Sequence, residues 1–284
     1  MKKRMIINLF LILLLFAGLS LLLYPSISDY WNSFHQSRAI SSYAEAVSSL
    51  DENRYAALWQ EAKQYNQSLL DRPNDYLLSE EQFAEYESLL NVSGTGVMGY
   101  VDIPGIDCTL PIYHGTGEGV LQVAVGHLEW TSLPVGGEGT HCVLSGHRGL
   151  PSAKLFTDLD KMEVGDTFDL CILNETLTYE VDQIMIVEPH ETSALQIVPG
   201  EDYCTLVTCT PYAKNTHRLL VRGHRMETES AAPAVHITAD AVQVEPLRVA
   251  PLVAAIILFF ILLIGLIQNC RIRMWKKRGG GKRW

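Results

Sequence analysis

A cysteine, an arginine and a histidine stand where their side chains can serve nucleophilic catalysis. Cys209 ends a β-branched run that predicts a strand, and Pro211 follows, so we expect the thiol at a surface and not in a core. Arg218 lies nine residues further on. If it opens the next antiparallel strand, a hairpin brings it to the same end of the sheet as Cys209. His147 follows another predicted strand, in a glycine-flanked loop.

These residue types meet the needs of acyl transfer. A thiol attacks well only as a thiolate, the leaving amine needs a proton, and the tetrahedral intermediate carries an oxyanion. His147 can handle the proton, and the guanidinium of Arg218 can hold the oxyanion. Because side chains alternate along a strand, Cys209 and Arg218 can share one face while His217 lies on the other. Arg218, and not His217, is therefore the predicted partner of Cys209.

The other histidines do not predict a metal site. They show no short-spaced ligand pattern with cysteines or carboxylates. They include His114, His127, His141, His190 and His224. We expect neither a metal nor another cofactor.

Two apolar runs of 20 residues, 5–24 and 249–268, are each long enough to cross a bilayer as a helix. Their outer flanks, 1–4 and 269–284, are basic, which predicts two cytoplasmic tails and an extracellular middle region. The first run lacks a clear small-x-small cleavage site, so we expect a retained anchor more than a cleaved signal peptide. The chain is predicted to be a two-pass protein of the cell membrane.

The charge distribution agrees with this topology. The two outer flanks hold ten of the 22 Lys and Arg residues and none of the 32 Asp and Glu residues. Twelve basic and 32 acidic residues remain between the apolar runs, a net charge of −20. Basic tails fit anionic lipid headgroups, whereas an acidic middle region argues against nucleic acid as a partner.

The middle region changes in character at residue 97. Residues 25–96 predict helices: an apolar stripe runs from 40 to 70, and Ser79 opens a capping box before a short helix through Leu90. Residues 97–226 predict about eight short strands, and so a closed or nearly closed barrel. Residues 227–248 read as a stalk. The expected strands are 98–103, 108–113, 122–125, 141–145, 167–173, 177–182, 203–208 and 217–222.

Five of the six cysteines precede the second apolar run, an odd number, so at least one is free or pairs between molecules. Four of the five sit in apolar strand-like runs and are expected to be small core residues. These are Cys108, Cys142, Cys171 and Cys204.

Several stretches resemble the sortases, the cell-surface cysteine transpeptidases of Gram-positive bacteria. The run ending at Cys209 looks like the sortase signature, and longer stretches resemble the class C, pilin-polymerising branch. The similarity covers roughly residues 36–226. The stretches are 110–116, 126–134, 145–159, 205–212 and 215–224.

The resemblance implies an all-β core, the eight-stranded sortase barrel, with an N-terminal helical segment and two flanking transmembrane helices. His147, Cys209 and Arg218 take the family's catalytic positions. We assign the neighbouring Thr208 and Ser145 to substrate binding. The implied reaction cleaves an LPXTG-like signal of a secreted protein and joins its Thr to a lysine ε-amine of an acceptor pilin.

Class C enzymes typically carry a lid with an Asp-Pro-aromatic tripeptide over the cysteine. This chain departs from that pattern, since its loop between the two predicted helices has no such tripeptide. Asp75 and Tyr76 are the nearest equivalent and our candidate lid residues.

Three alternatives stay open. A sortase that attaches single proteins to peptidoglycan would use a cell-wall amine as acceptor. A membrane-tethered binding domain without activity would have no need of a complete His147, Cys209 and Arg218 set. A papain-like hydrolase would place its cysteine at the start of a helix, whereas Cys209 ends a strand.

Overall fold

The computed structural model describes residues 2–70, 77–212, 214–226 and 259. The chain divides into two units, residues 1–27 with 236–284, and residues 28–235. Three predicted segments lie outside the described residues, apart from Phe259. They are the stalk (227–248), the second membrane helix (249–268) and the basic tail (269–284).

Four α-helices are described: α1 (Lys2–Ser48), α2 (Glu52–Leu70), α3 (Glu80–Ser88) and α4 (Glu118–Leu121). The helix predicted over 40–70 is interrupted, because Asp51 Oδ1 accepts the Arg54 N–H at 2.7 Å and so caps a new helix. The capping box at Ser79 is confirmed, with reciprocal bonds to Gln82. Among the described residues, α1 alone is long and apolar enough to cross a membrane.

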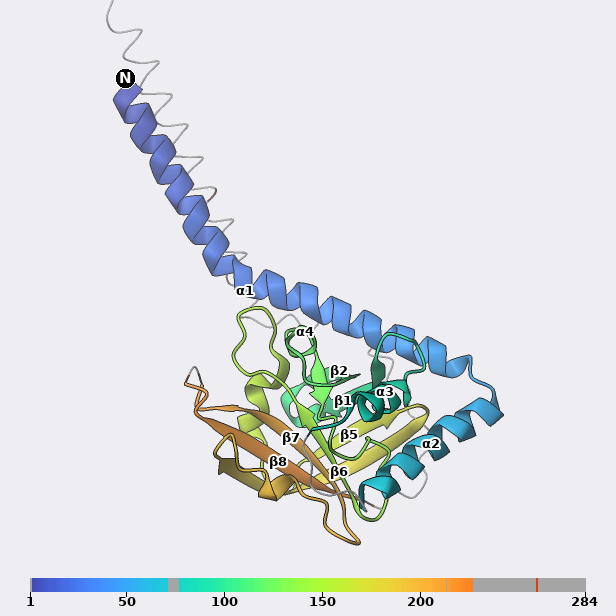
Figure 1. The fold of residues 1–284 in the computed structure, drawn as a ribbon. Helices are drawn as coiled ribbons and strands as arrows, with labels where there is room; N and C mark the ends of the chain where they lie inside the picture. The colour runs from blue at the N-terminus through green and yellow to red at the C-terminus, as the bar shows by residue number, and fades with distance from the viewer. Residues whose placement is uncertain (1, 71–76, 213, 227–258, 260–284) are drawn as a thin grey trace, which may run out of the picture. The chain divides into compact units, whose positions relative to one another are not determined.

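Eight strands close into a barrel in the order β1-β2-β3-β4-β7-β8-β6-β5 (Figure 1). The predicted eight-stranded barrel is confirmed. The strand predicted at 122–125 is misplaced, since helix α4 precedes it and β3 begins at Val125. The strands are β1 (Val97–Ile103), β2 (Cys108–His114), β3 (Val125–His127), β4 (Thr140–Ser145), β5 (Thr167–Ile172), β6 (Glu175–Val187), β7 (Asp202–Thr210) and β8 (His217–Arg225).

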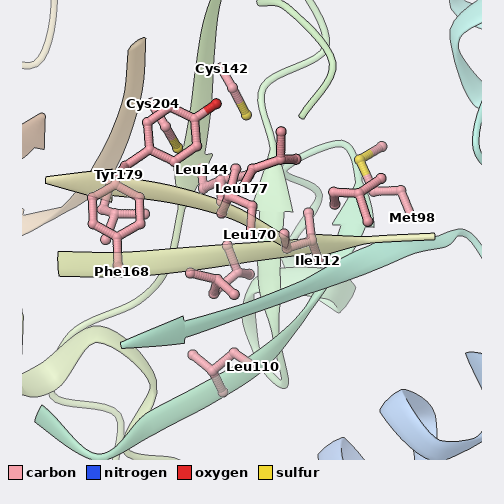
Figure 2. Close-up of a cluster of buried hydrophobic side chains, with 14 of the residues drawn as sticks. Met98, Leu110, Ile112, Cys142, Leu144, Phe168, Leu170, Leu177, Tyr179 and Cys204 are labelled. Carbon is pink, nitrogen blue, oxygen red and sulfur yellow. The ribbon is translucent and has the colours of Figure 1, made fainter. Parts of the chain in front are cut away.

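The barrel interior is filled by apolar side chains from all around the sheet (Figure 2). Phe168 and Tyr179 stack at 5.6 Å between ring centroids. Cys142 and Cys204, a register pair on β4 and β7, lie in this core, as does Cys108. Cys171 is only partly buried, so the prediction of a core position is wrong for this residue. All five cysteines in the described residues are free thiols.

The N-terminal helices dock on the barrel through buried polar contacts. Tyr43 on α1 donates to the Met98 carbonyl at 2.9 Å. Asn66 on α2 exchanges two hydrogen bonds with the Leu133 backbone, at 3.0 and 2.7 Å. Tyr86 on α3 lies 3.0 Å from His127 Nδ1 and accepts the Gly115 N–H at 2.9 Å. These contacts make the helical segment part of the same unit as the barrel.

A buried histidine holds the β6–β7 connection against the sheet. His141 on β4 is 1 % exposed. Its Nδ1 lies 2.9 Å from the Gln196 carbonyl, and its Nε2 lies 2.7 Å from the Thr205 hydroxyl. A carbonyl only accepts, so Nδ1 carries the proton and Nε2 accepts from Thr205. The neutral ring is therefore fully satisfied.

This arrangement predicts a loss of stability on acidification. Burial lowers the pKa of His141 from 6.5 to about 4, so the unfolded chain binds a proton that the folded chain excludes. Stability should therefore fall as pH drops from about 6.5 toward 4, by up to roughly 3 kcal/mol from this residue. Urea unfolding in detergent solution across this range measures the effect. The His141→Gln variant should show a flatter pH profile, and an unchanged profile would contradict the assignment.

Candidate active site

Cys209 and Arg218 lie directly opposite each other on the β7–β8 hairpin. The register pairs Cys209 with Arg218 and Thr208 with Leu219, so the predicted antiparallel geometry is confirmed. Both side chains are partly exposed. The Arg218 guanidinium donates to the main-chain carbonyls of Asn215 and His217, at 3.3 and 3.2 Å. These bonds hold its head group near the strand's start.

His147 is brought alongside by a long-range parallel pairing. β4 runs parallel to β7 with Ser145 opposite Val207, and the ladder continues as the Gly146 N–H donates to the Val207 carbonyl at 3.0 Å. Extending that register by two residue pairs, past the end of β4, would set His147 opposite Cys209. A Cβ on Gly146 would lie 2.7 Å from the Phe156 ring, so glycine is needed where the chain leaves the strand.

Thr208 does not fit the substrate-binding role predicted for it. Its side chain is 1 % exposed, and its hydroxyl donates to the Gly146 carbonyl at 2.7 Å. Side chains alternate, so Thr208 lies on the face of β7 opposite Cys209. We reassign it as a residue that ties β7 to the loop carrying His147. Ser145 is partly exposed, and its register partner Val207 lies on the same face of β7 as Cys209. Ser145 therefore remains a candidate for substrate binding.

The face of the sheet that carries Cys209 also carries an apolar cluster outside the barrel interior. Val143, Val207, Leu220 and Leu195 are its buried members. Leu206 and Val221, next to them in sequence, belong to the interior core instead. Met185 and Val187 of β6 pack on the outer cluster. Val187 pairs with Arg218 in register, so apolar surface begins directly beside the two reactive side chains.

An ion pair that no sequence pattern predicts supports the loop that carries His147. Arg148 binds Asp160, twelve residues further on, and its Nη1 lies 3.4 Å from the Thr210 hydroxyl. Asp160 belongs to the 3-10 segment Leu155–Lys161. An open pocket of about 690 Å³ adjoins this pair. Leu219 on its wall lies on the face of β8 opposite Arg218.

Two other predictions concern metal binding and the lid. The described residues contain no group of three or more His, Cys, Asp or Glu side chains placed to hold a metal ion. The candidate lid residues Asp75 and Tyr76 lie outside the described residues. The flanking helices α2 and α3 are both bonded to the barrel, as described above.

The described geometry can support thiol-based acyl transfer. It groups a partly exposed thiol, an imidazole and a guanidinium at one end of three strands that a filled core holds rigid. A nucleophile, a proton carrier and a cationic oxyanion donor are the components such a reaction requires.

Comparison with known proteins gives a consistent result. A family model described as the sortase domain matches residues 101–226. Sortase D of Bacillus subtilis is 32% identical over 115 residues, which are 40% of this chain and 55% of that protein. Sortase A of Streptococcus agalactiae is 30% identical over 135 residues, which are 46% of this chain and 54% of that protein. The chain thus spans about half the length of these two relatives.

Two solved structures match a longer part of the chain. Sortase C1 from Streptococcus agalactiae is 53% identical, with a TM-score of 0.66, over 68% of this chain and 100% of that one. Sortase C from Streptococcus pneumoniae is 46% identical, with a TM-score of 0.62, over 68% of this chain and 99% of that one. With the barrel and the sortase domain match, these similarities show that the chain belongs to the sortase family, and within it to class C.

Proposed function

We propose that this chain is a membrane-anchored cysteine transpeptidase that cleaves an LPXTG-like sorting signal and joins pilin subunits through a lysine isopeptide bond. One observation supports the catalytic part above the others. Cys209 pairs with Arg218 on the β7–β8 hairpin, and the parallel β4–β7 pairing ends two residues before His147, at the same end of the sheet. The roles of the three residues follow from this grouping.

The first half of the reaction forms a thioester. His147 takes the proton of the Cys209 thiol, and the sulfur attacks the carbonyl carbon of the signal's Thr. Arg218 stabilises the oxyanion that develops there. The Thr–Gly bond breaks, and His147 returns the proton to the departing Gly amine. The signal's Thr is then bound to Cys209 through a thioester.

The second half transfers the acyl group to a lysine. The ε-amine of the acceptor attacks the thioester carbonyl, and His147 accepts the proton that the amine loses. The Cys209 sulfur leaves and is reprotonated. One amide bond is broken and one is formed, so the reaction requires neither an oxidant nor a cofactor.

The outer apolar cluster suits the Leu and Pro of such a signal. Met185 and Val187 are partly buried members of that cluster and lie next to Arg218 on the β6–β8 ladder. Apolar side chains seated there would remove water from the reacting bond and set its distance to Cys209. Ser145, whose register partner Val207 belongs to that cluster, is our candidate for bonding the signal's backbone.

The acceptor assignment rests on the class C relatives. The structure from Streptococcus pneumoniae is described in terms of pilin substrate specificity, and a further match is the sortase C1 of a group B streptococcal pilus island, 44% identical. Attachment to a cell-wall amine uses the same thioester and differs only in the amine. The two reactions therefore diverge after Cys209 is acylated.

The membrane placement rests on the sequence together with α1. The 18-residue apolar window in α1 has a mean hydropathy of 2.8. With the basic flanks, it supports an anchor that leaves the catalytic domain outside the cell, followed by a second span at 249–268.

The product of the reaction is the direct test of this proposal. The full chain is incubated with an LPXTG-tailed protein and a lysine-bearing candidate pilin, beside a Cys209→Ala control. Mass spectrometry should show a Thr-to-Lys isopeptide only with the intact thiol. A thioester that yields hydrolysis alone would favour a different acceptor, and a crosslink that persists in Cys209→Ala would exclude Cys209 as nucleophile.

Thr208 is predicted to position the His147 loop. The Thr208→Val variant leaves the buried Gly146 carbonyl without its partner, which costs roughly 1–3 kcal/mol of stability. A loosened His147 should also lower kcat about tenfold or more with little change in KM. Peptide cleavage kinetics measure both. Thr208→Ser keeps the hydroxyl and should restore kcat; equal losses in both variants would show that the hydroxyl is not responsible.

A further inference from the structure

We propose that one face of α1, just beyond the apolar run, lies in the headgroup region of the membrane. Tyr30, Trp31 and Phe34 form this aromatic face, with exposed fractions of 65%, 64% and 57%. They recur at spacings of one, three and four residues, which places them side by side on a helix. The inference depends on the proposed anchoring of the chain by residues 5–24.

The opposite face of the same helix is bonded to the barrel. Asp29 Oδ1 accepts the Lys154 N–H at 2.8 Å. Asn32 Nδ2 donates to the Ser152 carbonyl at 2.8 Å, and Gln36 Nε2 donates to the Val123 carbonyl at 2.7 Å. Positions 29, 32 and 36 share one face of a helix. These three bonds fix the rotation of the helix, so the aromatic face cannot turn inward against the barrel.

The side chains of the aromatic face are of the kind that a membrane interface accommodates. Tyr and Trp combine an apolar ring with a polar group, and both are enriched at the level of the lipid headgroups. His35 extends the face, with its ring 4.9 Å from that of Trp31. An apolar face paired with a polar, protein-bonded face is the pattern of a helix that lies along an interface.

The position of the face in the chain identifies the membrane as its partner. The apolar run ends at Tyr24, and Phe34 lies ten residues further along the same helix, about 15 Å if the helix is straight. The headgroup layer on each side of a bilayer is only roughly 5–8 Å thick. An upright helix would therefore carry Trp31 and Phe34 past the headgroups into water.

A bend after the run removes this conflict. Pro25 lies inside α1, one residue beyond the apolar run, and it supplies no backbone N–H for the helix. Helices bend at such prolines. A bend there lets the following turns run along the membrane surface, with the aromatic face in the lipid and the barrel-bonded face toward water.

Fluorescence quenching by brominated lipid tests this placement in the full chain. The background protein carries Trp275→Phe and Trp284→Phe, because those residues follow the second apolar run in sequence. It is reconstituted in phosphatidylcholine vesicles with and without lipid brominated close to the headgroup. We expect strong quenching that is mostly lost in Trp31→Phe. The matched control Trp59→Phe, on α2 and packed partly against the core, should leave the quenching unchanged.

Each other outcome contradicts the inference in a distinguishable way. Quenching that persists in Trp31→Phe would mean that Trp31 does not contact lipid. Trp31 emission that is protected from both brominated lipid and aqueous iodide would mean that protein, such as a second copy of the chain, covers the face. Failure of the chain to float with vesicles after carbonate extraction would remove the proposed anchoring, while leaving the proposed transpeptidase chemistry intact.

Discussion

The parallel pairing of β4 with β7 is the constraint on which the site depends. Cys209 and Arg218 are neighbours on a hairpin and would meet in any fold that forms it. His147 lies 62 residues before Cys209 in the sequence. It reaches the same end of the sheet because β4 pairs in parallel with β7. Cys142 and Cys204 pair in this ladder, and the Thr208–Gly146 hydrogen bond closes it, so the position of His147 is set by backbone and core contacts together.

The two faces of the sheet have different roles: the interior face stabilises the barrel, and the outer face carries the reactive side chains. The interior side chains of β4, β7 and β8 fill the barrel, whereas the outer face of the same strands carries the thiol, the guanidinium and an apolar cluster. Rigid strands with a filled core can hold reactive groups within a narrow range of distances, which acyl transfer requires. The β6–β7 connection, fastened by His141, contributes Leu195 to the outer cluster. The site is thus supported from both sides of one sheet.

Local patterns in the sequence were sufficient for the capping box, the Cys209–Arg218 hairpin and every strand except β3, which was predicted at 122–125 and begins at Val125. Alternation along β7 already placed Thr208 on the face away from Cys209, and its burial agrees with that position more than with substrate binding. The parallel pairing that brings His147 in was not predictable from local pattern, because register between distant strands is set by the whole core. The Arg148–Asp160 pair and the His141–Gln196 bond also join separate segments, and residue type alone does not reveal such contacts.

The most direct test of this account measures acylation of Cys209 when His147 or Arg218 is removed. Rapid-quench intact-mass spectrometry with an LPXTG peptide should show a thioester on the wild-type chain. The His147→Ala and Arg218→Ala variants should form it slower by two orders of magnitude or more, roughly the effect of losing a general base or an oxyanion donor. Their far-UV circular dichroism should match that of the wild-type chain, which shows that the fold is intact. Thioester formation at the wild-type rate in either variant would contradict the proposed grouping of the three residues.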